Sequence, residues 1–266
     1  MLIFTIIVLT VLFVLLTISV VLYFIQDTFI FHAEKLPLDY EFSFKNEFEE
    51  INLDAEDGNT LNAVLFKANN SKGILIYFHN HSGNIEHCSN MPIDFILNKN
   101  YDILKMDYRG YGKSTGKYNE ELMLSDSLLW YDYVRKNYVE DLITVYGRGI
   151  GATFATYVSS RNNPNQLVLE SPLFDLFTTA SFLYPYVRIK KIISNYKFDT
   201  AAYIDKVKCK IYIFHGVKDR LVHYSNGQKL YELVKEKSEL FLIPEGNHYN
   251  LINDNTYLDE INKILE

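Results

Sequence analysis

Short apolar runs recur along the chain from residue 73 onwards, and this recurrence limits the fold more than any other feature. Continuous apolar runs of about four to eight residues are typical of strands that are covered on both faces. The runs are Gly73–Phe78, Ile103–Asp107, Leu142–Tyr146, Leu167–Leu169, Lys210–Phe214 and Leu240–Ile243. We therefore expect a central sheet built from these segments.

Stretches with apolar residues at helical spacing separate the runs, so strands and helices alternate along the chain. These stretches are Ile85–Leu97, Glu120–Lys136, Ile150–Arg161, Ser225–Glu236 and Leu251–Leu265. The alternation predicts an α/β fold with a mostly parallel sheet and helices on both faces. Ahead of it, Asp57-Gly58 lies between two apolar segments of Ile51–Lys67 and predicts a hairpin.

One segment interrupts this alternation. Phe174–Tyr196 is rich in Phe, Leu, Tyr and Ile and follows a predicted strand. We interpret residues 173–197 as a small cap over the sheet, within a domain of residues 49–266. The aromatic side chains suit an apolar acyl group near a membrane, and they equally suit simple core packing, because aromatic clusters usually belong to the core.

The first part of the chain has a different composition. Residues 1–26 carry no charged side chain, and Leu2–Ile25 is almost entirely Leu, Ile, Val and Phe before the first charge at Asp27. A helix of about 20 such residues crosses a bilayer core of about 30 Å. A cleaved signal peptide would have a basic start and a small-residue cleavage site, and this segment has neither. We therefore expect residues 1–26 to be a single-pass transmembrane anchor in a lipid bilayer, with residues 27–48 as a connector.

Charged residues and cysteines bear on the membrane orientation, on nucleic-acid binding and on disulfide formation. Lys35 and Lys45 lie downstream of the predicted span and no basic residue lies upstream, which favours a cytoplasmic domain under the positive-inside rule. The formal charge of −7 argues against a nucleic-acid partner, because phosphate binding needs clustered Lys and Arg. Cys88 and Cys209 are far apart in the sequence and are expected to be free thiols.

A glycine-flanked turn follows the predicted strand Leu142–Tyr146 and precedes a predicted helix. Its residues are Gly147, Arg148, Gly149, Ile150 and Gly151. This context is typical of a nucleophile elbow, G-x-S-x-G, in which the outer glycines permit a sharp turn and the central side chain stands at its tip. Here the outer pair is intact and the central residue is glycine. Taken alone, a glycine turn without function explains the motif equally well.

Two further strands are followed by residues that can complete a catalytic triad. Asp219 follows Lys210–Phe214, and His248 follows Leu240–Ile243. In the fold that carries the elbow, the triad runs in the chain order nucleophile, acid, histidine. Alone, Asp219 could be a loop-capping carboxylate and His248 a surface histidine. Together with the elbow, their order and strand context predict a site at the carboxyl ends of the strands.

Three more segments accompany the elbow and this pair, namely Phe78–Asn84 (FHNHSGN), Asp107–Gly116 (DYRGYGKSTG) and Leu169–Pro172 (LESP). With them, residues 48–265 resemble the α/β hydrolases, and most closely the N-terminally membrane-anchored, serine aminopeptidase-like branch. The resemblance implies an α/β-hydrolase fold and a small acyl-type substrate or ligand that is an ester, a thioester or an amide. No nucleotide, flavin or metal motif is present, so we expect no cofactor.

The resemblance also assigns the groups that would stabilise an oxyanion. The loop after His79 would supply one backbone N–H, from Asn80 or His81, and Ile150 would supply the other. The family usually reads H-G-N-A-G-N in this loop, so Asn80 and His81 are departures. Oxyanion donors are often backbone N–H groups, which tolerate changes of side chain.

Other polar residues near these motifs have simpler interpretations. His79, His81 and His87 lack the ligand spacing and the carboxylates expected of a metal site, so no metal is predicted. By resemblance, Asp107 and Arg109 are structural residues that tie the loop near the elbow.

Glycine at position 149 has no side chain with which to form an acyl-enzyme. Thr153 would point back into the packing, and Ser114 is more typical of a turn, so neither is expected to replace the nucleophile. Three hypotheses follow. The chain is a non-catalytic, membrane-tethered binding or scaffold module, or Asp219 and His248 activate water directly in the space beside Gly149. Alternatively, an ordinary serine hydrolase has been altered at this one position.

Overall fold

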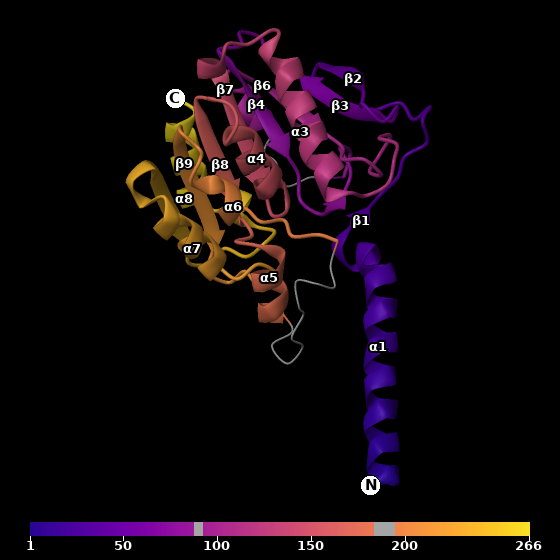
Figure 1. Ribbon diagram of the computed structural model, residues 1–266. Coiled ribbons are helices and arrows are strands. Elements are labelled where there is room, and N and C mark those ends of the chain that lie inside the picture. Colours follow the sequence, from indigo (N-terminus) through magenta and orange to yellow (C-terminus); the bar gives the residue numbers. More distant parts are fainter. Residues whose placement is uncertain (88–92, 184–194) are drawn as a thin grey trace.

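The computed structural model describes residues 1–87, 93–183 and 195–266. An eight-stranded sheet in the order β10-β9-β8-β7-β4-β6-β3-β2 lies at its centre (Figure 1). The strands are β2 (Phe48–Asp54), β3 (Thr60–Phe66), β4 (Gly73–Phe78), β6 (Tyr101–Met106), β7 (Ile143–Arg148), β8 (Gln166–Glu170), β9 (Lys210–Gly216) and β10 (Ser238–Ile243). The strands from β10 to β6 pair in parallel, and β3 and β2 add antiparallel at one edge. The predicted mostly parallel sheet is confirmed.

Side chains of each central strand enter two separate cores in alternation. Ile74 and Ile76 of β4 face one core, and Leu75 and Tyr77 face the other, since successive strand residues point to opposite faces. The helices over the first core are α3 (Glu120–Arg135), α4 (Gly151–Ser159) and α7 (Ser225–Leu233), and those over the second are α2 (Ile93–Leu97) and α8 (Asn255–Ile264). Helices cover both faces, as predicted, and this explains the uninterrupted apolar runs.

One predicted helix is only partly present. The prediction over Ile85–Leu97 is wrong at its start, where the side chain of Asn84 accepts a hydrogen bond from the His87 N–H at 2.9 Å and forms a turn instead. Residues 88–92 lie outside the described part, and α2 is the helical segment that follows them. Local side-chain hydrogen bonds of asparagine compete with helix in this way.

The predicted helix over Leu251–Leu265 is divided in two. A short 3₁₀ helix, η3 (Leu251–Asn253), precedes α8, and η2 (Lys235–Lys237) similarly follows α7. The carboxylate of Asp254 accepts hydrogen bonds from the N–H groups of Thr256 at 2.9 Å and Tyr257 at 3.3 Å, so it caps a new helix at this point.

The cap segment is anchored at both of its ends. It contains α5 (Leu176–Leu183), and residues 184–194 of the predicted cap lie outside the described part. The Leu176 N–H donates to the Lys197 carbonyl at 2.8 Å, so the outgoing and returning chains meet. The short helix α6 (Ala201–Ile204) then leads towards β9.

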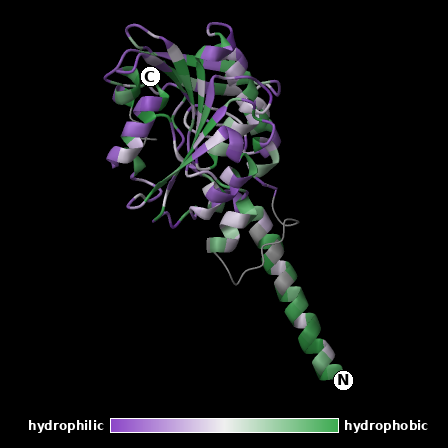
Figure 2. Ribbon diagram, turned by 90° about the vertical axis from the view of Figure 1, so that its left-hand side faces the viewer, coloured by the Kyte–Doolittle hydropathy of each residue, from purple (hydrophilic) through white to green (hydrophobic). Residues whose placement is uncertain are grey.

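The N-terminal helix α1 (Leu2–Ile30) projects from the domain and is apolar along most of its length (Figure 2). No single helix among residues 1–87, 93–183 and 195–266 meets the length and hydropathy expected of a membrane span. The pair Leu2–Ile18 and Tyr23–Ile30, bent by 44°, meets them together. The helix continues past residue 26 into the predicted connector.

The connector that follows α1 is bound to the domain. β1 (His32–Ala33) pairs in parallel with β5 (Ser82–Gly83), which directly follows the β4 loop. Phe31 is buried among aromatic rings, stacking on Tyr118 with ring centroids 4.3 Å apart. Because β5 lies just beyond the carboxyl end of β4, α1 leaves the domain from the edge of the sheet at which the predicted site lies. Figure 1 places α5 on that same side.

Candidate functional site

The elbow has the geometry that its glycines predict. A Cβ added at Gly147 would lie 2.5 Å from the Gly151 carbonyl oxygen, and one at Gly151 would lie 2.1 Å from that of Phe78, so neither position accepts a side chain. Gly149 has φ +55°, the left-handed conformation expected at the tip of the turn. Arg148 ends β7, and Ile150 is the N-cap of α4.

Asp219 and His248 meet beside this elbow. The His248 Nδ1 lies 2.7 Å from Asp219 Oδ2, and both residues are buried. The other carboxylate oxygen, Oδ1, accepts hydrogen bonds from the N–H groups of Leu221 at 2.9 Å and Val222 at 2.8 Å. Burial acts to raise the pKa of Asp219, but the hydrogen bonds that its carboxylate accepts from His248 and from the Val222 N–H outweigh it, so the pKa is lowered from its usual value. The carboxylate is therefore ionised and fully paired.

The side chain of Asn80 occupies the space where a nucleophile would stand. A Cβ built on Gly149 would lie 2.2 Å from Asn80 Oδ1 and 2.7 Å from its Cγ, far inside contact distance. The Asn80 Nδ2 lies 2.8 Å from His248 Nε2. The expectation of a free space for water beside Gly149 is therefore wrong, because this carboxamide fills it.

The backbone N–H of His81 determines which atom donates and which accepts in the hydrogen bonds that link Asn80, His248 and Asp219. The His81 N–H can only donate, and it lies 2.8 Å from Asn80 Oδ1, so that atom must be the acceptor. The amide Nδ2–H then donates to His248 Nε2, and the His248 Nδ1–H donates to Asp219. The His248 ring is neutral, and the lone pair it would use as a base is taken by Asn80.

The two predicted oxyanion donors at His81 and Ile150 lie in different surroundings. The His81 N–H is engaged by the side chain of Asn80, and the His81 ring donates to the same oxygen from Nδ1 at 2.9 Å. Burial lowers the pKa of His81 to about 4, which keeps its ring neutral. Ile150 lies at the start of α4, on the other side of Gly149. A ligand that used the His81 donor would first have to displace the Asn80 carboxamide.

A buried ion pair, which the sequence did not reveal, supports the histidine loop. Arg148 Nε lies 2.9 Å from Glu170 Oε1, and the Arg148 guanidinium also donates to the His248 carbonyl. Tyr257 donates to Glu170 Oε2 at 3.1 Å, and Tyr146 donates to the same oxygen. The LESP segment marked Glu170 as noteworthy, but only its register opposite Arg148 in β7 and β8 gives it a partner.

The remaining candidates have structural surroundings. Arg109 donates to both carboxylate oxygens of Asp126 at 2.7 Å and to Asp57 at 2.7 Å, so it ties α3 to the β2–β3 hairpin. Thr153 Oγ1 pairs with Thr200 Oγ1 at 2.8 Å, away from the elbow tip. Ser114 donates to the Asp107 carbonyl at 2.9 Å. Within the described ranges, no three His, Cys, Asp or Glu side chains gather closely enough to hold a metal ion.

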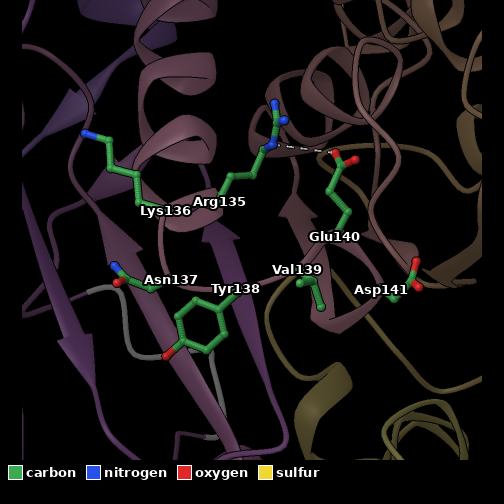
Figure 3. A pocket seen from close by; sticks show the side chains of 7 residues that line it. All are labelled: Arg135, Lys136, Asn137, Tyr138, Val139, Glu140 and Asp141. Carbon is green, nitrogen blue, oxygen red and sulfur yellow. Dashed lines mark ion pairs between the residues drawn. The ribbon is translucent and has the colours of Figure 1, made fainter.

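A surface pocket of about 420 Å³ lies elsewhere (Figure 3). Residues 135–141 line it, from the end of α3 through η1 (Glu140–Leu142), which leads into the start of β7. It therefore lies at the amino ends of the strands, opposite the elbow. Arg135 and Glu140 form a loose ion pair there at 4.0 Å, and no group of the Asp219–His248 site reaches it. Ligands of open α/β sheets bind at the other edge.

The buried histidines make stability depend on acid. Burial lowers the pKa of His79 to about 3 and of His215 to about 4, against an ordinary 6.5. Below pH 6.5 the unfolded chain binds more protons than the folded chain, so the free energy of unfolding falls as the pH drops towards 4. Each such histidine contributes up to about 1.4 kcal/mol per pH unit in this window.

We expect His215→Gln to flatten the dependence of the free energy of unfolding on pH between 6.5 and about 4, measured by chemical denaturation of the full chain in detergent. His87, whose side chain is 58% exposed, provides the control, since His87→Gln removes no buried ring. Equal slopes for His215→Gln and the unaltered chain would contradict the assignment of a proton-linked cost to this buried ring.

The chain is similar to known hydrolases in sequence and fold, although no family model matches it. It is 24% identical over 199 residues to the α/β hydrolase domain-containing protein aho-3 of Caenorhabditis elegans, covering 74% of this chain and 58% of that protein. It is 26% identical over 188 residues to the lysophosphatidylserine lipase ABHD12 of Danio rerio, covering 64% and 49%. An esterase of Pyrococcus furiosus superposes with a TM-score of 0.71 at 19% identity, covering 89% of this chain and 97% of the esterase.

The sheet order, the elbow between β7 and α4, and the Asp219–His248 pair agree with these likenesses. The predicted α/β-hydrolase fold is confirmed, and the chain is similar in sequence to proteins of the α/β-hydrolase superfamily.

Proposed function

We propose that this protein is a membrane-tethered α/β-hydrolase-fold protein that binds an acyl-type ligand without turning it over. The observation that carries the proposal is the Asn80 carboxamide, which fills the place of the nucleophile and engages His248 Nε2 at 2.8 Å. Two requirements of hydrolysis fail together. Position 149 offers no nucleophile, and the histidine lone pair is unavailable as a base.

The same contact argues against a single altered residue in an ordinary serine hydrolase. Serine at position 149 would begin with a Cβ 2.2 Å from Asn80 Oδ1. The family's usual loop has glycine at the position of Asn80, so two positions have changed in complementary directions. Asparagine has entered on one side of the contact, and glycine on the other.

An acyl-type ligand is supported by the relatives and by the cap. The Danio rerio relative is named a lysophosphatidylserine lipase, and the Pyrococcus furiosus neighbour is an esterase. In α5, Phe177 is buried while Phe182 is half exposed. Such a surface, on the side of the sheet that carries the elbow, suits the apolar chain of an ester, thioester or amide.

The tether is proposed from α1. Its two segments, Leu2–Ile18 and Tyr23–Ile30, together have the length and hydropathy of a membrane span, for which about 20 apolar residues are needed. The lysines downstream of the helix favour a cytoplasmic domain on a single-pass anchor. Because α1 leaves the domain from the elbow side, α5 would then lie on the bilayer side of the domain, from which an acyl lipid would enter.

A second candidate is hydrolysis by water that the Asp219–His248 pair activates. The intact 2.7 Å hydrogen bond between them favours it, since it holds the ring in the tautomer that a general base needs. This mechanism requires Asn80 to leave its present position, because the carboxamide takes both the lone pair and the space that a water would use.

Hydrolysis of p-nitrophenyl butyrate by the full chain in detergent distinguishes the two candidates. We expect the unaltered protein and His248→Ala to be equally slow, because the histidine is not free to act. Faster hydrolysis by the unaltered protein that disappears in His248→Ala would overturn the binding proposal and establish the water mechanism. General-base catalysis by histidine would give a rate difference of about 10²–10⁴.

A further inference from the structure

The groups around the Asn80 side chain define which hydrogen bonds a ligand must make if it takes the place of that side chain. Two groups face the Asn80 carboxamide, a donor in the His81 N–H and an acceptor in His248 Nε2. The first lies 2.8 Å from the amide oxygen and the second 2.8 Å from the amide nitrogen. Any ligand group that replaces Asn80 must satisfy both, since His248 is only 2% exposed and cannot turn to water instead.

A carboxamide meets both demands from one carbon atom. Its oxygen accepts from the His81 N–H, and its N–H donates to His248, as the Asn80 side chain does. An ester or a thioester offers the acceptor alone, so it leaves the His248 lone pair buried without a partner. A carboxylate offers only acceptors and brings a second negative charge close to Asp219, which is already ionised.

We infer that the site selects carboxamides bearing an N–H, such as primary fatty amides or N-acyl amines, over esters and acids of the same chain length. This inference rests on the proposed function and narrows its ligand class. An unpaired buried acceptor weakens binding roughly tenfold to hundredfold, so the amide should bind more tightly than its ester by that factor. The Asn80 side chain itself ends in a carboxamide, which is the group that the site would prefer.

These contacts also indicate a small molecule with which ligand binding at this site can be tested. Replacing Asn80 with glycine, the residue usual in the family, removes a CH₂–CO–NH₂ group from a site where Asn80 is 4% exposed. Acetamide is that group with one added hydrogen, so it is the molecule that fits the vacated space. Methyl acetate has the same acyl carbon but lacks the donor, and acetate lacks the donor and carries a negative charge.

The experiment measures acetamide, methyl acetate and acetate binding to full-length Asn80→Gly in detergent, by calorimetry and by the rise in melting temperature. Hexanamide and methyl hexanoate are then compared on the unaltered chain. We expect each amide to bind roughly tenfold to hundredfold more tightly than its ester, and this preference to disappear in Asn80→Gly/His248→Ala. Asn80→Ala, with formamide as the probe, replaces Asn80→Gly if that variant does not fold.

Each outcome bears on a distinct claim. Equal or tighter binding of the ester overturns the amide preference while leaving acyl-ligand binding intact. Folded Asn80→Gly that binds none of the probes overturns the amide preference, and failure of the unaltered chain to bind hexanamide and methyl hexanoate overturns the binding function as well. Turnover of methyl hexanoate by the unaltered chain overturns the non-catalytic function, whichever probe binds best.

Discussion

Gly149→Ser alone will remain inactive on p-nitrophenyl butyrate. Asn80→Gly/Gly149→Ser will hydrolyse this ester faster than the single variant by a factor on the order of 10²–10³. The single change places a Cβ 2.2 Å from Asn80 Oδ1, in a loop where Asn80 is buried and hydrogen-bonded on both sides. The second change removes the obstacle, frees His248 Nε2 and releases the His81 N–H. A nucleophile, a base with its acid, and an oxyanion donor are then present together.

Two controls separate this explanation from a general loosening of the loop. Asn80→Gly alone frees the histidine without a nucleophile and should gain far less than the double variant. Adding His248→Ala to the double variant should remove the gain, because the new serine would lose its base. Full activity in Gly149→Ser alone would contradict the steric role given to Asn80.

The second large effect concerns stability. Arg148→Met should lower the free energy of unfolding by about 3–5 kcal/mol, because it leaves the buried Glu170 carboxylate without its arginine partner. The side chains of the pair are only 3% and 2% exposed, and the arginine also donates to the His248 carbonyl. Chemical denaturation of the full chain in detergent measures the loss.

Matched variants test the cause. Arg148→Met/Glu170→Gln removes both charges and should recover much of the lost stability, since no uncompensated charge remains. Lys218→Met breaks an ion pair with Glu245 whose side chains are 57% and 77% exposed, and should cost about 0–1 kcal/mol. A loss below about 1 kcal/mol for Arg148→Met would contradict the stabilising role given to this buried ion pair.

The sequence predicted the framework of this protein because local patterns determine it. Apolar runs of strand length marked β4 and β6–β10, and the parallel arrangement followed from the helices between them. The chain order of the elbow, Asp219 and His248 brought these residues to one edge of the sheet, and the structure joins the last two at 2.7 Å. Their catalytic assignment stays a prediction.

What the sequence missed depends on contacts between distant segments. Asn80 was expected to act through its backbone, and nothing local indicates that its side chain reaches His248, 168 positions away. The pairing of Arg148 with Glu170 needs the register of β7 on β8, and the pairing of β1 with β5 needs the whole fold. A signal was nevertheless available for Asn80. At positions 80 and 149, which touch, this chain has asparagine and glycine where the family usually has glycine and serine.

This contact also orders the steps by which such a site can arise from a hydrolase. In an ancestor with glycine at 80 and serine at 149, asparagine could not have come first, because its carboxamide needs the volume of the serine side chain. In that order of events, loss of the serine would open the volume that the asparagine side chain now fills. From the present state, restoring serine alone would bring its Cβ against the end of the Asn80 side chain, so the carboxamide would have to move before the serine could act. Under the proposed function, a return to hydrolysis would therefore need a change at Asn80 as well as at Gly149.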